Sequence, residues 1–252
     1  MNEVISISDI LISLRGISKE YVSESGIIKV IEEITIDIKK EFLAILGPSG
    51  CGKSTLLRII AGVEKYSRGE IIYAEGNIPK MGFVFQFPSL LPWMTVLENV
   101  ALPLKNSGMR KEEARETARR YLSLVGLAGF ENLYPHELSG GMRQRVNFAR
   151  ALAVQPEILL MDEPFSNLDP LTAETLRAEV LDIWLSGITP LKGIVMVTHA
   201  VDEAIFLADR IVILTPRPSK IAKEIKVDLP RPRNRRSPEF EKLEDLVYSF
   251  VS

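Results

Sequence analysis

Apolar and polar residues alternate at two places near the start of the chain. Ile10, Ile12 and Leu14 are separated by single residues, and residues 30–38 repeat the same two-residue period. Successive side chains of a strand point to opposite faces, so this period predicts two amphipathic strands. The first of these patterns lacks the basic and apolar blocks of a signal peptide.

Four other runs are short and apolar at nearly every position: residues 42–46, 158–161, 193–198 and 210–214. Such runs are typical of strands in a parallel sheet, because helices cover both of its faces. The first run leads into a Gly-rich turn, after which a helix is predicted that ends at Gly62. These strands and helices indicate an α/β fold with a mainly parallel sheet and an N-terminal antiparallel β portion.

A helical pattern replaces the strand pattern between about residues 87 and 153. Residues 111–125 place Ala114, Ala118 and Leu122 on one face, and the pattern ends at Gly126. A further helix is predicted after Asp169-Pro170, with Asp169 as the N-cap.

We therefore predict one domain with a core of about residues 1–86 and 154–215. A helical subdomain at about 87–153 is inserted into this core. A C-terminal extension at about 216–252 carries a strand at 221–227 and then a short helix with an apolar face, formed by Phe240, Leu243, Val247 and Phe250.

Composition narrows the class of protein. The chain has 252 residues, 46% of them hydrophobic, which is enough for a sizeable core. Its 31 Lys and Arg residues nearly balance 33 Asp and Glu residues, so overall charge gives no reason to expect a nucleic-acid partner. A single cysteine cannot form an internal disulfide. No apolar run approaches the ~18 residues of a spanning helix. We expect a cytoplasmic protein that meets a membrane only as a peripheral subunit on its inner face.

A phosphate-binding loop follows the first buried strand. Its pattern is Gly, four residues, then Gly-Lys-Ser, and it lies between a strand and a helix. Backbone N–H groups of such a loop surround phosphate oxygens, the lysine adds a charge for the β- and γ-phosphates, and the Ser54 hydroxyl ligates Mg²⁺. The predicted cofactor-binding residues are Gly47, Pro48, Ser49, Gly50, Cys51, Gly52, Lys53, Ser54 and Thr55.

Cys51 is the only cysteine of the chain. The loop amides, the following helix and Lys53 are expected to favour its thiolate. We nevertheless favour a small residue tolerated in a tight loop over a redox role.

Two carboxylates follow the apolar run at 158–161. Asp162 and Glu163 then lie at the carboxyl end of a strand, where ligands of open α/β sheets bind. We predict that Asp162 belongs to the Mg²⁺ shell and that Glu163 is the general base for an attacking water.

A second candidate anion site begins at Ser139. Residues 138–145 read Leu-Ser-Gly-Gly-Met-Arg-Gln-Arg, and Ser139, Gly140 and Gly141 open a predicted helix. With this segment the chain resembles the ATP-binding cassette (ABC) ATPases over nearly its whole length. A P-loop kinase or GTPase would leave the Ser139 segment unexplained.

The resemblance implies further site residues. Gln86 matches the glutamine that contacts Mg²⁺ or the attacking water, and His199 matches the histidine that reaches the γ-phosphate. Asp169 belongs to a loop at the dimer interface, and Tyr21 matches the aromatic residue that stacks on adenine. In this family two chains pair head to tail, so that Ser139 of one chain completes the ATP site of the other.

The Leu-Leu-Pro-Trp segment at 90–93 resembles importer ATPases of the nitrate, sulfonate, taurine and bicarbonate type. Burial inside the helical subdomain would explain Leu90, Leu91 and Trp93. We favour a groove that receives a helix from a membrane permease, itself supplied by a solute-binding protein. The alternative function is a soluble ABC ATPase in nucleic-acid, ribosome or cofactor-assembly machinery.

A basic run in the C-terminal extension contains Arg231, Arg233, Arg235 and Arg236. Nucleic acid or anionic lipid could bind such a run. The balanced overall charge favours a solvated linker instead.

Overall fold

The computed structural model describes residues 9–24 and 26–251, which form two compact units. The first unit contains the described residues up to Pro79 and those from Lys192 onward, and the second contains Lys80–Leu191. Each unit is described by itself below. The boundaries predicted for the helical subdomain, at 87 and 153, stay a prediction.

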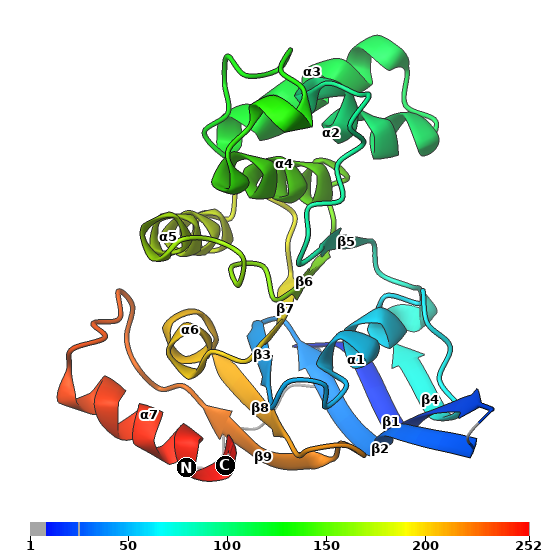
Figure 1. The fold of residues 1–252 in the computed structure, drawn as a ribbon, viewed down its shortest axis with the longest axis vertical. Helices are drawn as coiled ribbons and strands as arrows, with labels where there is room; N and C mark the ends of the chain where they lie inside the picture. Colours follow the sequence, from blue (N-terminus) through cyan, green and yellow to red (C-terminus); the bar gives the residue numbers. More distant parts are fainter. Residues whose placement is uncertain (1–8, 25, 252) are drawn as a thin grey trace. The chain divides into compact units, whose positions relative to one another are not determined.

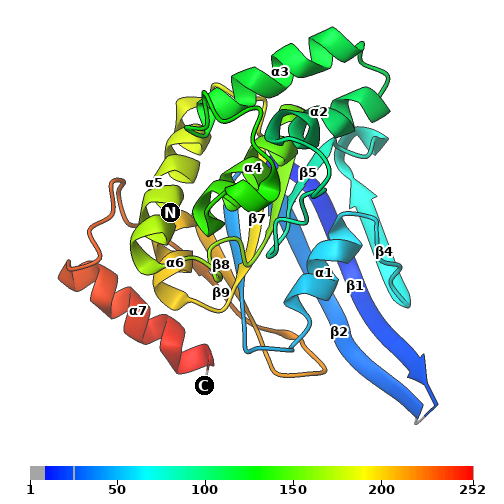
Figure 2. The same ribbon diagram turned by 45° about the horizontal axis from the view of Figure 1, so that its top comes forward.

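An antiparallel sheet opens the first unit. β1 (Ile10–Ser23) lies between β2 (Gly26–Lys39) and β4 (Arg68–Tyr73). The side chains of Ile12 and Leu14 are fully buried, but Leu11 and Ser13 are buried as well, so the predicted strand is confirmed and its amphipathic character is not. In Figure 2 the three strands lie side by side as one curved sheet.

A mostly parallel group of strands forms the rest of this unit's β structure. β3 (Phe42–Leu46) lies between β7 (Gly193–Thr198) and β8 (Arg210–Leu214), parallel to both, and β9 (Ile221–Lys226) runs antiparallel to β8. β3 and β7 are buried at every position, as their continuous apolar sequences predict. The described residues of this unit also form three α-helices, α1 (Lys53–Ile60), α6 (Val201–Leu207) and α7 (Pro238–Val251), and a short 3-10 helix at Ala74–Gly76.

The second unit combines a pair of parallel strands with four α-helices and a short 3-10 helix at Pro135–Glu137. β5 (Met81–Val84) pairs with β6 (Ile158–Asp162). The helices, shown in shades of green in Figure 1, are α2 (Val96–Asn106), α3 (Lys111–Leu124), α4 (Gly140–Ala153) and α5 (Pro170–Ser186). α2, α3 and α4 pack on one another. α3 buries Ala114, Ala118 and Leu122, which confirms the predicted apolar face.

The predicted C-terminal helix forms, but only part of its apolar face is covered. α7 packs against α6, β8 and β9 and buries Phe240 and Val247. Leu243 is half-buried and Phe250 is exposed.

The basic run in front of α7 is not a solvated linker, so that prediction is wrong. Arg233 is only 7% exposed. Its guanidinium donates to five carbonyl oxygens, those of Ile205, Phe206, Ala208, Val227 and Leu229. Three of these carbonyls lie at the end of α6, where a helix leaves acceptors without partners. Burial lowers the pKa of Arg233 to about 10.

The two neighbouring arginines also contact the first unit. Arg231 pairs with Asp209, and the Arg235 guanidinium lies 4.6 Å from the ring centroid of Phe206. Arg236 alone of the four is exposed. Sequence patterns do not reveal the main contacts of this basic run, because most of the acceptors are main-chain groups distant in sequence.

Candidate functional site

The phosphate-binding loop connects β3 to α1 and depends on two left-handed glycines. Gly50 has φ 75° and Gly52 has φ 117°, a region that side chains disfavour. A Cβ at Gly52 would also lie 2.9 Å from Cγ1 of Val30. The glycines of the motif are therefore required by the backbone path of the loop.

Lys53 is the first residue of α1, and its side chain folds against the loop. Nζ donates to the carbonyl oxygens of Gly47, at 2.8 Å, and Pro48, at 3.1 Å. The lysine is buried, with 4% of its surface exposed. The structure thus holds a buried cation on the loop predicted to bind phosphate.

A second cation contacts the same loop and was missed by sequence reasoning. Arg217, in the turn between β8 and β9, donates from Nε and Nη2 to the Gly50 carbonyl oxygen at 3.2 and 2.7 Å. In a phosphate-binding nest the N–H groups converge, so the carbonyls point away and need other partners. Arg217 is such a partner. Arg217 lies 167 residues after Gly50, and no local motif signals the contact.

Cys51 does not have the environment that we expected. Its thiol is buried, with 1% of the residue exposed. Burial raises the pKa of the Cys51 thiol, and the nearby charges of Lys53 and Arg217 oppose this only in part. The prediction of a favoured thiolate is therefore wrong, because desolvation outweighs the cations.

Tyr21 lies near the end of β1, opposite Ile28 of β2, and is 38% exposed. The Lys19 ammonium is 4.5 Å from its ring centroid. That ammonium also pairs with Glu64 and donates to the Lys65 carbonyl oxygen. The Lys19 ammonium is thus fixed near the ring by contacts of its own.

His199 is exposed in the short connection between β7 and α6. The buried Thr198 before it donates its hydroxyl to Glu203 Oε2 at 2.6 Å and accepts from the Ala200 N–H at 3.1 Å. These two hydrogen bonds fix the backbone on both sides of His199.

In the second unit, Gln86 and Glu163 are brought together. They follow β5 and β6, and Gln86 Nε2 lies 3.4 Å from Glu163 Oε2 and 3.3 Å from Ser166 Oγ. Glu163 has φ 43°, an uncommon conformation that clusters at functional sites. Asp162, the last residue of β6, is buried with 4% exposure.

Ser139 and Asp169 are the N-caps of two helices in this unit. Ser139 Oγ accepts from the Met142 N–H at the start of α4, and Asp169 Oδ1 accepts from the Thr172 N–H at the start of α5. Interactions with the side chain and then the N–H of Thr172 lower the pKa of Asp169.

Gly140 and Gly141 form the first turn of α4. A Cβ at Gly141 would lie 2.5 Å from Thr172 Cγ2, so this glycine permits close packing of α4 on α5. The Leu-Ser-Gly-Gly segment therefore has a structural role besides the predicted anion site.

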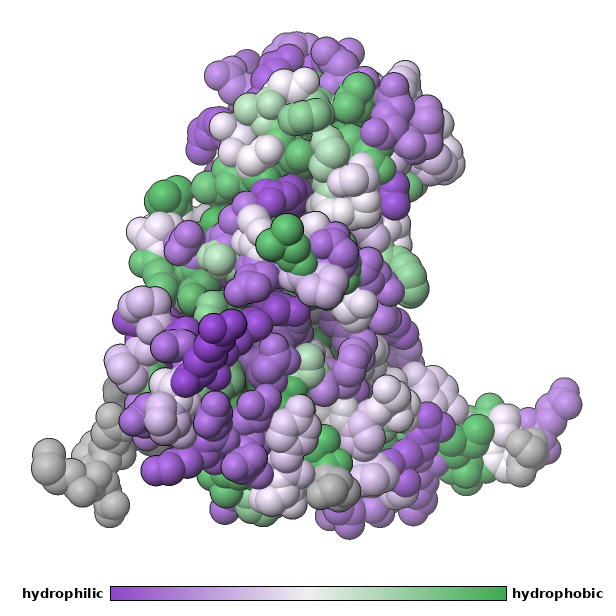
Figure 3. Space-filling model, turned by 60° about the vertical axis from the view of Figure 1, so that its left-hand side comes forward, coloured by the Kyte–Doolittle hydropathy of each residue, from purple (hydrophilic) through white to green (hydrophobic). Residues whose placement is uncertain are grey.

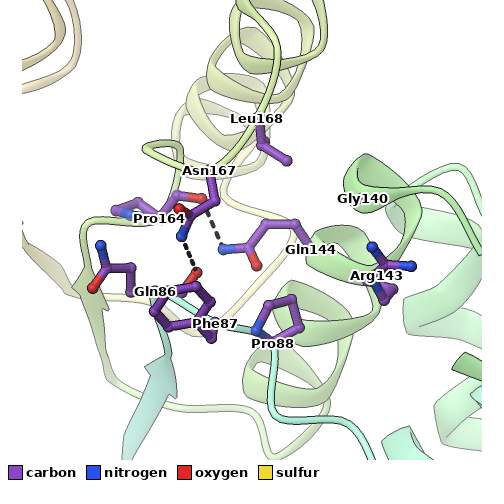
Figure 4. Close-up of a pocket in the computed structure, with 9 residues that line it drawn as sticks. All are labelled: Gln86, Phe87, Pro88, Gly140, Arg143, Gln144, Pro164, Asn167 and Leu168. Atoms are coloured by element: carbon purple, nitrogen blue, oxygen red, sulfur yellow. Dashed lines mark hydrogen bonds between the residues drawn. The ribbon is translucent and has the colours of Figure 1, made fainter.

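A cavity of about 160 Å³ lies beside these residues, within the second unit (Figure 4). Residues from the segment after β5, from α4 and from the segment after β6 line it: Gln86, Phe87, Pro88, Gly140, Arg143, Gln144, Pro164, Asn167 and Leu168. Asn167 Nδ2 donates to the Gln86 carbonyl oxygen at 3.3 Å. Sequence reasoning did not single out Gln144, because the carbonyls that its amide contacts belong to other segments of the chain.

Trp93 is 70% exposed and Phe87 is 66% exposed, while Leu90 and Leu91 are half-buried. Burial therefore does not explain Trp93. On the face drawn in Figure 3, hydrophobic residues also gather just below the hydrophilic upper edge, over the part formed by α2, α3 and α4.

The site residues are divided between the two units. Tyr21, the phosphate-binding loop and His199 belong to the first, whereas Gln86, Ser139, Asp162, Glu163 and Asp169 belong to the second.

Comparison with known proteins decides the family. A profile described as ABC transporter matches residues 31–166. An uncharacterized ABC transporter ATP-binding protein of Methanocaldococcus jannaschii is 45% identical over 234 residues, which cover 91% of this chain and 86% of that protein. The chain belongs to the ABC ATPase family. This ABC ATPase is thus an ATP-hydrolysing enzyme, as its sequence predicts.

Two further comparisons bear on branch and fold. An aliphatic sulfonates import ATP-binding protein of Bacillus cereus is 42% identical to the ABC ATPase over 241 residues, 94% of each chain. Two solved dimeric ABC cassettes, one in a post-hydrolysis state with ADP and Pi, match with TM-scores of 0.76 and 0.77. They are 34% and 35% identical, and each match covers 87% of this chain and all of the other. The predicted P-loop fold is confirmed.

In the described part of the ABC ATPase, no helix has the length and apolarity needed to cross a membrane. No group of three or more His, Cys, Asp or Glu residues there is placed to hold a metal ion.

Proposed function

We propose that this ABC ATPase is the ATP-hydrolysing subunit of an importer. It binds Mg-ATP together with a second copy of itself or a homologous ATPase subunit, and it drives an integral-membrane permease. The observation that carries the hydrolytic part is the contact between Gln86 and Glu163 at the ends of two parallel strands. The similarity to a sulfonate import protein supports the import part.

The phosphate-binding loop fits the triphosphate of ATP. Gly50 and Gly52 adopt left-handed backbone conformations, and Val30 leaves no room for a side chain at Gly52. Lys53 places a buried ammonium on the loop. Bound Mg-ATP supplies the phosphoryl group that is transferred to water. Lys53 would exchange its contacts with Gly47 and Pro48 for phosphate oxygens, which form stronger, charge-assisted hydrogen bonds. Tyr21 would stack on the adenine.

Ser54, Gln86 and Asp162 would hold Mg²⁺. The donor set is one hydroxyl, one amide oxygen and one carboxylate, which suits a hard cation that also takes oxygens from phosphate and water. Such a site needs no cluster of acidic residues.

Glu163 would accept the proton of the attacking water, and Gln86, held 3.4 Å away, would orient that water. His199 would contact the γ-phosphate. Ser139, Gly140 and Gly141 would serve the ATP site of the partner copy, with Asp169 at the same interface. Two identical chains would then form two composite sites related by a two-fold axis.

Light scattering of the Glu163→Gln variant tests this proposal. With Mg-ATP the variant binds nucleotide without hydrolysing it, so its mass should double. The double variant Lys53→Ala/Glu163→Gln and a sample with EDTA should stay monomeric. If the single variant stays monomeric with Mg-ATP at high micromolar concentration, the composite site is contradicted.

The permease is proposed to dock at the surface formed by Phe87 and Trp93. Large exposed aromatic side chains mark interaction sites, and aromatic residues dominate the energetics of interfaces. The transported solute is proposed to be a small anion of the sulfonate, nitrate, taurine or bicarbonate type. The permease would receive it from a solute-binding protein.

Membrane retention tests the docking surface. Trp93→Ala should reduce the fraction of the chain recovered on membranes of producing cells, and should leave basal hydrolysis unchanged. Ile188→Ala is the matched control, because Ile188 is also an exposed apolar residue of the second unit, at 73%. Equal retention of both variants would contradict this docking surface.

A further inference from the structure

Two buried amides of α4 contact the backbone next to Gln86 and Glu163. Gln144 is 2% exposed and Asn147 is fully buried. Three residues apart on a helix, they lie on the same face. An amide in such a position must find hydrogen-bond partners, because burial without them costs free energy.

Gln144 joins two separate segments. Its Nε2 donates to the Pro164 carbonyl oxygen at 2.8 Å and lies 3.4 Å from the Phe85 carbonyl oxygen. Asn147 reinforces this contact, since its Nδ2 donates to Phe85 at 2.8 Å and to Gln144 Oε1 at 3.3 Å. Figure 4 shows the Gln144 amide pointing toward Pro164.

The two carbonyls belong to the immediate neighbours of the catalytic pair. Phe85 precedes Gln86, and Pro164 follows Glu163. Both lie just beyond the ends of β5 and β6, where the ladder of the parallel pair no longer fixes the backbone. Side-chain hydrogen bonds therefore set the path of the backbone at these points.

The same helix holds the rest of the segment after β5. Arg150 donates to the carbonyl oxygens of Pro88 and Ser89 at 2.6 and 3.1 Å, and Asn147 Oδ1 accepts from Arg150 at 3.2 Å. α4 begins at the Ser139 N-cap. One rigid helix thus carries the proposed anion-binding end and the side chains that hold the Gln86 segment.

We propose that Gln144 and Asn147 are positioning residues that set the separation of Gln86 and Glu163. Through these hydrogen bonds, a displacement of α4 at its Ser139 end would shift the backbone beside both Gln86 and Glu163. This inference rests on the proposed roles of Gln86 and Glu163. It adds a hydrogen-bonded connection between the Leu-Ser-Gly-Gly helix and the hydrolytic residues.

The test substitutes Gln144 by methionine, which is similar in length and volume but lacks the N–H donors. A misplacement of about 1 Å can reduce a rate ~10²-fold, so we expect kcat to fall 10- to 100-fold. The KM for ATP should change less than about threefold, because the phosphate-binding loop belongs to the other unit. Gln155→Met is the matched control, since Gln155 is an exposed glutamine just beyond α4.

Asn147→Leu is the second variant, in case Gln144→Met folds poorly. It should cause a smaller loss of kcat, because Gln144 still contacts Phe85. Thermal unfolding and ATP binding establish that each variant is folded. A change confined to stability, with kcat unaltered, would overturn the inference.

A double-variant cycle separates positioning from general damage. If Gln144 acts through Glu163, the single-turnover rate of Gln144→Met/Glu163→Gln should equal that of Glu163→Gln alone. Independent losses that multiply would overturn the inference. Full turnover by Glu163→Gln would instead overturn the proposed function. Loss of turnover in Glu163→Gln with a normal kcat in Gln144→Met would overturn this inference alone.

Discussion

The phosphate-binding loop of the first unit and the Gln86–Glu163 pair of the second place their chemistry by different means. The loop presents main-chain groups, and its glycines and the cations Lys53 and Arg217 fix the backbone. The pair presents side chains, positioned by hydrogen bonds to neighbouring carbonyls from α4.

The difference determines which substitutions the loop and the Gln86–Glu163 pair each tolerate. A backbone site depends on residues that permit one set of dihedral angles, and these are contiguous in sequence. A side-chain site depends on supporting residues that can come from any element. Substitutions in the loop should therefore impair ATP binding. Substitutions around the Gln86–Glu163 pair should instead impair turnover.

The largest expected effects come from one substitution in each site, because one should largely abolish turnover and the other should weaken ATP binding. Glu163→Gln should leave ATP affinity within a few fold and reduce turnover about 10²–10⁴-fold, the range for loss of a general base. Lys53→Ala should instead weaken binding strongly, because it removes the buried cation of the loop. Titration with a fluorescent ATP analogue and steady-state hydrolysis measure the two quantities.

Asp162→Asn sharpens the same comparison. Proposed as a Mg²⁺ ligand, it should weaken binding in the presence of Mg²⁺ and have little effect in EDTA. Equal effects of Asp162→Asn and Glu163→Gln on affinity would contradict the division of roles between these carboxylates.

A smaller effect is expected at Gly52. Alanine there must adopt φ 117° and bring its Cβ to 2.9 Å from Val30, so we expect weaker ATP binding and a stability loss of ~1–3 kcal/mol. Gly62→Ala is the control: its φ is 73°, and no described atom lies within 4 Å of an added Cβ. That variant should lose ~1 kcal/mol of stability and bind ATP normally. Equal ATP affinities for both would contradict the backbone argument.

The sequence predicted the contiguous motifs and the buried strands more fully than the distant contacts that support them. The glycine spacing identified the loop, and continuous apolar runs located β3, β6, β7 and β8 within a residue of their bounds. Gln144, Asn147 and Arg217 escaped notice because each acts on a main-chain carbonyl of another segment. The prediction for the basic run failed at Arg233 for the same reason, since the end of α6 supplies its acceptors.

Arg217→Ala should have a modest effect. It leaves the Gly50 carbonyl to water, which replaces a charge-assisted hydrogen bond at an exposed position, so ATP affinity should fall about three- to tenfold with kcat nearly unchanged. Arg217→Lys should recover part of the affinity. Arg236→Ala, at an exposed arginine of the same unit, is the control. A fall in kcat with unchanged ATP affinity would mean that Arg217 supports hydrolysis and not the binding of ATP by the loop.

The smallest expected effect concerns the thiol of Cys51. Burial raises its pKa, so alkylation by iodoacetamide at pH 7–8 should be slower than that of a free cysteine and should accelerate only well above pH 8.5. The positive charge of Arg217 lowers this pKa, so Arg217→Ala should shift the alkylation profile to still higher pH. Because the folded-state pKa exceeds the unfolded value, the stabilising contribution of the thiol is complete below about pH 8.5. It is lost as the pH rises through the folded value.

Bound Mg-ATP should slow this alkylation further, because phosphates in the loop would cover the thiol and oppose its negative charge. A label on Cys51 should also block hydrolysis, because the sulfur is tightly packed against Gly47. A Cβ added at Gly47 would lie only 3.0 Å from this sulfur. Mass spectrometry of the labelled peptide and an ATPase assay on the same sample decide the matter. Fast alkylation at pH 7 that ATP does not slow, with hydrolysis intact, would mean that this loop does not enclose the phosphates.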